Sequence, residues 1–292
     1  MRPTVPEPDL APVPEPVVGL AAGRRHSVVI RNDGTVTAFG HGGASECRVS
    51  EWSDIVAVAA GNVHTFSNTG KSHTVGLCRD GTVVAAGWNG HGQCDVGDWT
   101  TVRAVAAGWR FTLGLLRDGT VLGAGRCVEG QLAVEGWRDI VAITCGDWHS
   151  VGVTSAGRVV GAGVGRAGQL DVSDWREVVQ TSAGYLHTLG LTHEGRVLAA
   201  GDRGSGACEV GAWQDVAHVS AGSHHSIGLH RSGRVIAAGS NSHGQCDTEG
   251  WRDVVAVAAG SLHTLGLRAD GTVLATGCND YQQCDAPCLA AG

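Results

Sequence analysis

The sequence predicts an all-β fold, a seven-bladed β-propeller of four-stranded antiparallel blades. First, a glycine that ends an AAG-like signature recurs every 38 residues, with one interval of 47. The seven positions are Gly23, Gly61, Gly108, Gly146, Gly184, Gly222 and Gly260. Second, each repeat contains short Val- and Ala-rich runs, which are typical of strands. Third, Asp-Gly pairs such as Asp80-Gly81 separate two of these runs and indicate tight hairpins, so each repeat is expected to form one blade.

Four runs in each repeat are the expected strands of one blade. They are illustrated by DIVAVAAG (54–61), HTLGL (263–267), TVVAAG (82–87) and QCDVGDW (93–99). Consecutive strands joined by tight turns pair antiparallel, so each repeat predicts one antiparallel sheet. A parallel β-helix is the structural alternative, but its coils are usually shorter and lack a hairpin signal in every unit.

The repeats divide the chain into a short lead and one large domain. A Pro-rich lead spans 1–16, and its prolines argue against a regular strand from this segment that closes the ring. The propeller spans 17–292. Its approximate repeats are 17–52, 53–99, 100–137, 138–175, 176–213, 214–251 and 252–289.

Composition and charge exclude several classes of partner. The chain has 292 residues, a net charge of -7 and no run of Lys or Arg, so neither nucleic acid nor an anionic membrane is an expected partner. No apolar run reaches transmembrane length, and the lead lacks the apolar centre of a signal peptide. We therefore expect a cytoplasmic monomer with reduced cysteines, no cofactor and no metal.

The repeated pattern AAGxxHTxGLxxDGTVxAxG…GQ resembles the regulator-of-chromosome-condensation repeat family, and the resemblance covers nearly all of 17–289. It implies a seven-bladed propeller. The family includes a chromatin-bound nucleotide exchange factor, a secreted bacterial β-lactamase inhibitor and many interaction modules. The chain is more similar to the bacterial inhibitor, although it lacks an export signal as well as a basic chromatin-binding tail. The resemblance therefore implies the fold and leaves the partner open.

Positions that are filled alike in most repeats are interpreted as structural. One column is expected to form hydrogen bonds to backbone at blade corners, because its members lie too far apart to share a metal ion: His26, His73, His149, His187, His225 and His263. A second column consists of Cys47, Cys94, Cys208, Cys246 and Cys284. Leu132 and Leu170 fill the same position in two repeats, which indicates a buried apolar slot; thiol chemistry is the alternative. A third column closes six of the repeats and is expected to consist of packing residues: Trp52, Trp99, Trp137, Trp175, Trp213 and Trp251.

Residues that break the repeat pattern are interpreted as functional. The antiparallel order places the two variable segments of every blade on one face, and all eight aromatic residues outside the tryptophan column fall at or next to it. In the third repeat, Trp-Arg-Phe (109–111) replaces the Ser-Leu-His of 261–263. The predicted binding residues are Trp88, Trp109, Arg110, Phe111, Asp147, Trp148, Tyr185, Arg24, His224 and Tyr281. Trp, Tyr and Arg dominate protein-binding hot spots, so the prediction is a scaffold that recognises a partner protein through this face.

Three alternatives stay open. A small polar ligand could replace the protein partner, or the role could be purely structural. An enzyme acting on a small molecule or peptide at the top of the channel would use acids and bases from His41, His91, His224, His243, Glu46, Glu129, Asp147 and Asp202. The extra segment Asn62–Ser72 is expected to form a flap on the same face. Gln180 and His218 are either a satisfied buried pair or a functional pair that lines the channel.

Overall fold

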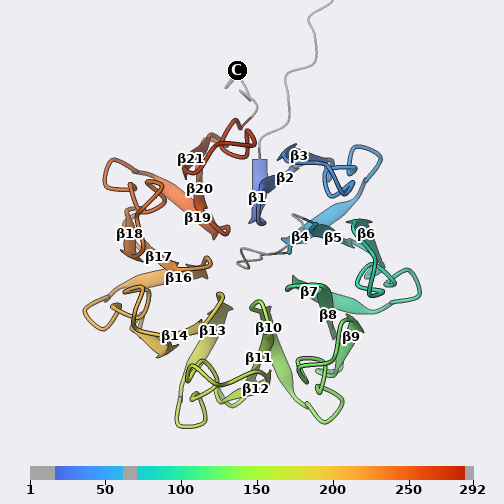
Figure 1. Ribbon diagram of the computed structural model, residues 1–292, viewed down its shortest axis with the longest axis horizontal. Coiled ribbons are helices and arrows are strands. Elements are labelled where there is room, and N and C mark those ends of the chain that lie inside the picture. Colours follow the sequence, from blue (N-terminus) through green and yellow to red (C-terminus); the bar gives the residue numbers. More distant parts are fainter. Residues whose placement is uncertain (1–16, 62–70, 287–292) are drawn as a thin grey trace, which may run out of the picture.

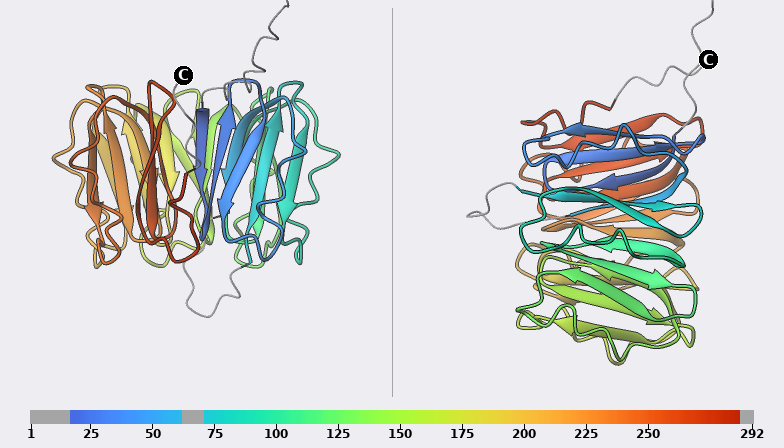
Figure 2. Two further views of the ribbon diagram at one scale, coloured as in Figure 1. Left: turned by 90° about the horizontal axis from the view of Figure 1, so that it is seen from above. Right: turned by 90° about the vertical axis from the view of Figure 1, so that its right-hand side faces the viewer.

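The computed structural model describes residues 17–61 and 71–286 as a ring of seven sheets around a central channel (Figure 1). Each sheet comes from one repeat, and seven sheets confirm the predicted number of blades. All the described elements are strands. In side view the strands run along the channel, and the turns gather at the two ends of the ring (Figure 2). The described residues contain no helix that is long and apolar enough to cross a membrane.

Every blade has an inner, a middle and an outer strand. The inner strands are β1 (Val17–Ala22), β4 (Ile55–Ala60), β7 (Val102–Ala107), β10 (Ile140–Cys145), β13 (Val178–Ala183), β16 (Val216–Ala221) and β19 (Val254–Ala259). The middle strands are β2 (His26–Arg31), β5 (His73–Cys78), β8 (Phe111–Leu116), β11 (His149–Thr154), β14 (His187–Thr192), β17 (His225–His230) and β20 (His263–Arg268). The outer strands are β3 (Val36–Gly40), β6 (Val83–Gly87), β9 (Val121–Gly125), β12 (Val159–Gly163), β15 (Val197–Gly201), β18 (Val235–Gly239) and β21 (Val273–Gly277).

The prediction of a fourth strand in each blade is wrong. The expected segment QCDVGDW (93–99) makes local backbone bonds instead, from Asp95 N to Gly92 O and from Trp99 N to Val96 O. These short-range bonds occupy backbone groups that a fourth strand would need for pairing. The segment still packs as predicted, because Val96 is buried. The fourth run therefore closes the blade through its side chains and turns.

The predicted face is present, and we call it the upper face. It carries the turn between the inner and middle strands and the loop that follows the outer strand of each blade. In blade 3, Arg126 N donates to Arg110 O at 2.8 Å, and in blade 4 Val164 N donates to Trp148 O at 3.0 Å. In six of the seven blades, this backbone bond joins the loop after the outer strand to the turn between the inner and middle strands. In blade 2, the equivalent bond joins Trp88 N to Ser72 O. The two variable segments of each blade are thus held side by side.

Adjacent blades are joined by the histidine column, although not by the backbone contacts that the sequence led us to expect. His187 Nε2 bonds to Ser226 Oγ on the next blade at 3.1 Å, and Ser226 Oγ in turn donates to Ala207 O at 2.8 Å. Because the hydroxyl proton is used by the carbonyl, the histidine must carry its proton on Nε2. The same relay joins five other junctions, starting from His26, His73, His149, His225 and His263.

The junction between blades 3 and 4 provides a test of this relay. Phe111 fills the histidine slot there, so Ser150 Oγ keeps its bond to Gln131 O without a histidine partner. Ser226→Ala should leave a buried ring N–H and a buried carbonyl unpaired and lower the free energy of unfolding by about 2 kcal/mol. Ser150→Ala removes one hydrogen bond fewer than Ser226→Ala does, so it should lower the free energy of unfolding by about 1 kcal/mol. Urea denaturation of both variants measures the difference; equal losses would contradict the relay.

The tryptophan column consists of packing residues, as predicted, and they lie between blades. A β-carbon added to Gly190 would lie 2.5 Å from Trp175, and one added to Gly114 would lie 2.7 Å from Trp99. Each tryptophan that ends a repeat therefore covers the middle-strand glycine of the next blade. In blade 1, Val29 takes the glycine position; the repeat pattern of the sequence has Leu289 in place of a seventh tryptophan, and this residue lies outside the described residues. The core is thus formed between blades.

The ring closes by the same contacts that join the other blades. Ser27 Oγ of blade 1 bonds to His263 Nε2 of blade 7 at 2.9 Å and donates to Gln283 O at 2.7 Å. The sheet of blade 7 contains β19, β20 and β21 from its own repeat. The prediction about the proline-rich lead concerns 1–16, which lies outside the described residues.

Candidate functional site

The upper face carries a continuous row of aromatic rings that crosses several blades. The ring of Trp109 lies 5.8 Å from that of Trp148, and Trp148 lies 5.9 Å from Tyr185 in an edge-to-face arrangement. Tyr185 in turn contacts the His224 ring at 5.5 Å. At the other end, the Arg110 guanidinium bridges Trp88 and Trp109, at 4.7 and 4.4 Å from the ring centroids. We call Trp88, Trp109, Trp148 and Tyr185 the aromatic arc.

The Trp-Arg-Phe turn differs from its counterparts in conformation as well as sequence. Arg110 has a φ of 65°, in the left-handed region, whereas no other described residue at this turn position has a positive φ. That conformation costs about 1 kcal/mol for a residue with a side chain. It places the guanidinium between two indole rings. The local strain therefore accompanies the half-buried stack of Arg110 between two indole rings.

Two of the predicted binding residues are not on the surface. Phe111 is fully buried and belongs to the core cluster of blade 3, because it fills the slot of the structural histidine. Asp147 is also fully buried. Predicting Phe111 as a contact residue was wrong in this respect, since only Trp109 and Arg110 of the turn reach the surface. Of the other aromatics, Phe39 packs beside Val29, and Phe66 lies outside the described residues with most of the predicted Asn62–Ser72 flap.

Charges of both signs border the arc. Arg126 lies 5.3 Å from the Trp109 ring centroid and donates to both carboxylate oxygens of Glu129. The hydrogen bonds to Arg126 hold the pKa of Glu129 below its usual range. His91 packs against Trp88 and lies 3.3 Å from Arg110; burial and the neighbouring Arg110 lower its pKa. The arc is therefore flanked by a fixed ion pair and a neutral imidazole.

The cysteine column holds the loops of the upper face. Cys47 Sγ donates to His41 O at 3.4 Å, and Cys246 Sγ makes the equivalent bond to Ser240 O. Burial raises the pKa of Cys47 to about 12 and that of Cys246 to about 11. These thiols are thus protonated donors at neutral pH, which supports the structural interpretation over thiol chemistry. The nine cysteines within the described ranges are all free.

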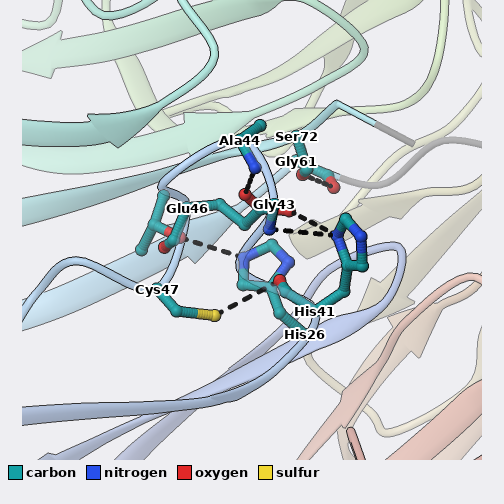
Figure 3. A network of polar contacts seen from close by, with 9 residues as sticks. His26, His41, Gly43, Ala44, Glu46, Cys47, Gly61 and Ser72 are labelled. Carbon is teal, nitrogen blue, oxygen red and sulfur yellow. Dashed lines mark hydrogen bonds and ion pairs between the residues drawn. The ribbon is translucent and has the colours of Figure 1, made fainter. Parts of the chain in front are cut away.

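A second polar cluster is formed by the upper-face loop of blade 1, beside residues of blade 2 (Figure 3). Glu46 occupies the glutamine position of the repeat and is buried; its Oε2 accepts from Ala44 N at 2.7 Å, and its Oε1 lies 3.2 Å from His41 Nδ1. The His41 ring meets Tyr281 edge-to-face at 5.2 Å, and the Arg25 guanidinium lies over the same tyrosine at 4.3 Å. The predicted residues Arg24, His224 and Tyr281 line a pocket of about 580 Å³ beside this cluster.

The family model of the Regulator of chromosome condensation (RCC1) repeat matches residues 68–93, 102–131, 140–169, 216–245 and 254–283, which together make up half of the chain. The chain belongs to the RCC1 repeat family. The seven blades agree with this assignment, and the resemblance read from the repeats is confirmed. No curated protein matches the sequence.

Two solved structures are similar to the chain in fold. Prp20p of Saccharomyces cerevisiae has 16% sequence identity and a TM-score of 0.67, over 90% of this chain and 83% of Prp20p. The ectodomain of the receptor kinase CR4 of Physcomitrella patens has 18% identity and a TM-score of 0.68, over 90% of this chain and 73% of that one. At this level of identity the likeness shows the fold alone.

The acids and bases predicted for an enzyme lie at several separate places among the described residues of this RCC1-repeat protein. Among the described residues, His41 is paired with Glu46, Glu129 with Arg126, and His243 with Ser242. Each pair belongs to a single blade. Of the remaining candidates, Asp147 is buried, Asp202 is half-buried, and burial lowers the pKa of His224. In the described part of the chain these candidates thus lie mainly in separate pairs, and His224 and His243 also line one pocket.

Gln180 and His218 line the central channel, which contains a cavity of about 260 Å³. They do not bond to each other. Gln180 instead accepts from Val219 N at 3.2 Å and donates to Val219 O at 3.3 Å, so it joins the inner strands of blades 5 and 6. Among the described residues His218 Nδ1 has no hydrogen-bond partner, and burial lowers the pKa of this histidine. The predicted pair is thus a glutamine that joins two inner strands and a separate buried histidine.

The sequence did not predict which cationic side chains lie over the rings of the aromatic arc. The Lys71 ammonium lies 5.3 Å from the Trp88 ring centroid, and Arg126 lies over Trp109. Arg110 and Trp88 come from different blades, so no local spacing reveals their contact. The available signal was the presence of Lys71, Arg110 and Arg126 in upper-face segments. It identifies candidates but not the ring that each one covers.

Proposed function

We propose that this RCC1-repeat protein is a binding scaffold that recognises a partner protein through the aromatic arc. The observation that carries the proposal is the continuity of the arc, in which ring contacts below 6 Å link Trp109, Trp148 and Tyr185 across three blades. Residues of these types dominate binding hot spots, where large rings are desolvated by a partner. A rigid propeller supplies such a surface with little conformational entropy to lose on binding.

Two details of the aromatic arc indicate that its residues serve partner binding and not the stability of the fold. The Nε1 atoms of Trp109 and Trp148 are buried and have no hydrogen-bond partner in the described part of the chain. Arg110 adopts its left-handed conformation at the same place. Unpaired donors and local strain both lower the stability of the free protein, and such features cluster at binding surfaces.

The charges around the arc favour a protein over a polyanion. Arg126 is neutralised by Glu129, Asp202 lies on the same face, and the whole chain has a net charge of -7. Nucleic acids require a stripe of unpaired cations. A related propeller gives general support: Prp20p, the yeast RCC1, is described with its binding to Gsp1p and histones and also bound to Kap60. The cytoplasmic location and the monomeric state stay predictions.

The test compares Trp109→Ala/Trp148→Ala with the wild type. A partner is captured from a lysate of the source organism, purified and titrated against both chains by calorimetry. Loss of two central anchors should weaken binding about 100-fold or more. Arg79→Ala/Arg117→Ala, which changes exposed side chains on the opposite face, is the control and should bind as the wild type does. An equal dissociation constant for a correctly folded double tryptophan variant would overturn the proposal.

A further inference from the structure

The pocket beside Tyr281 is a second concave site on the upper face, formed where blades 6, 7 and 1 meet. Its volume of about 580 Å³ lies within the range of small-molecule sites. Its polar wall consists of Arg25, Ser240, Ser242, His243, Asp280 and Tyr281. Residues of the aromatic arc do not line it. The ligand of this pocket can therefore be inferred independently of the protein partner proposed for the aromatic arc.

Arg25 is the central cation of this pocket. Its guanidinium lies 4.3 Å from the Tyr281 ring centroid. A guanidinium stacked on a ring keeps its N–H donors in its own plane, where they can bind two oxygens of one anion. The described residues form ion pairs that include His41–Glu46, Arg126–Glu129, His193–Glu177 and Arg196–Glu194, and none of these involves Arg25. Arg25 thus carries a positive charge in the pocket without a carboxylate partner in the described part of the chain.

The surrounding groups add a second charge and neutral hydrogen-bonding groups. Arg24 also lines the pocket, and burial together with the adjacent Arg25 lowers its pKa. The opposite wall carries a chain of polar groups, in which Ser240 Oγ lies 3.3 Å from Ser242 Oγ, and Ser242 Oγ lies 2.9 Å from His243 Nδ1. The Arg25 guanidinium and these hydroxyls line the same pocket, which makes it a favourable environment for a carboxylate or phosphate.

We propose that this pocket binds a small molecule through one oxyanion, a carboxylate or a phosphate, which Arg25 holds in its plane. Ser240, Ser242 and His243 bind polar groups on the opposite side of the ligand. Asp280 is the acidic residue of the wall and is exposed at the rim. It accepts from a hydroxyl or amino group and repels a second negative charge. The ligand class is therefore a polar molecule with a single oxyanion.

The test is calorimetric titration of the full chain with three probes: inorganic phosphate, glycerol 3-phosphate and lactate. The wild type should bind at least one probe with a dissociation constant of a few millimolar or lower. Arg25→Gln should weaken binding about tenfold or more, because it removes the bidentate charged contact. Arg166→Gln changes an exposed arginine of the same face that does not line the pocket, and it should bind as the wild type does.

The probes distinguish the two sources of the oxyanion. Tighter binding of the phosphates indicates a phosphate ester, and tighter binding of lactate indicates a carboxylic acid. Ser242→Ala, on the opposite wall, is a second variant and should also weaken binding. The proposal is overturned if no probe binds at about 20 mM, or if Arg25→Gln and Ser242→Ala both bind as the wild type does. Because these ligands are small molecules, either result is independent of the protein-binding test.

Discussion

Lowering the pH from about 7 to about 5.5 is expected to reduce the free energy of unfolding by about 7 kcal/mol. The six histidines that join the blades are responsible, since all are fully buried. Burial lowers the pKa to about 3 for His26, His149 and His225. It lowers the pKa to about 4 for His73, His187 and His263. In the unfolded chain each histidine has a pKa of about 6.5.

The sign follows from the protons bound by each state. Below about pH 6.5 the unfolded chain takes up protons that the folded chain excludes, so stability falls as the pH falls. The loss approaches about 1.4 kcal/mol per histidine per pH unit and ends only near the folded pKa values of about 3 to 4. Urea denaturation across this range measures the slope. His225→Phe, which imitates the natural Phe111 junction, should reduce the slope by about one sixth. A flat profile from about pH 7 to 5.5 would contradict buried neutral histidines.

Gly184→Ala is expected to lower the free energy of unfolding by about 3 kcal/mol or more. A β-carbon at this position would lie 2.3 Å from Gly222 O of the next blade and 2.4 Å from Cε1 of His187. Neither contact can relax easily, because one atom belongs to backbone and the other to a ring held by Ser226. The blade would have to move away from its neighbour and weaken the histidine relay.

Gly211→Ala is the matched control for this substitution. No heavy atom lies within 4 Å of a β-carbon added there, and its φ is not positive. The same chemical change should therefore alter stability by less than about 0.5 kcal/mol. Urea denaturation of both variants measures the contrast. Equal stabilities for the two variants would show that the close approach of the blades at Gly184 is not a constraint.

The repeat period allowed most of the fold to be predicted, because each unit carries its own strand and turn signals. It also placed the variable segments on one face, since strand direction alternates with each turn. The fourth strand could not be excluded, because Val96 has the burial of a strand residue while the surrounding backbone bonds are local. Local hydrogen bonds of this kind leave little trace in a hydrophobic pattern.

The candidate site was predictable in its residue types and only partly in its geometry. Departures from the repeat correctly identified Trp109 and Trp148 as neighbours on the upper face. The burial of Phe111 could have been predicted from the histidine that it replaces, because the histidines of this column are buried in all six remaining blades. The contact between Arg110 and Trp88 could not, because it depends on the left-handed turn and on the distance between two blades.

Hydrogen-exchange mass spectrometry of the chain with and without its captured partner tests the central claim most directly. If the aromatic arc is the binding surface, protection should concentrate at the upper-face turns around Trp109, Trp148 and Tyr185. The turns of the opposite face, such as those around Asp80 and Asp118, should exchange as they do in the free chain. Protection confined to the opposite face, with unchanged exchange around the arc, would contradict the account.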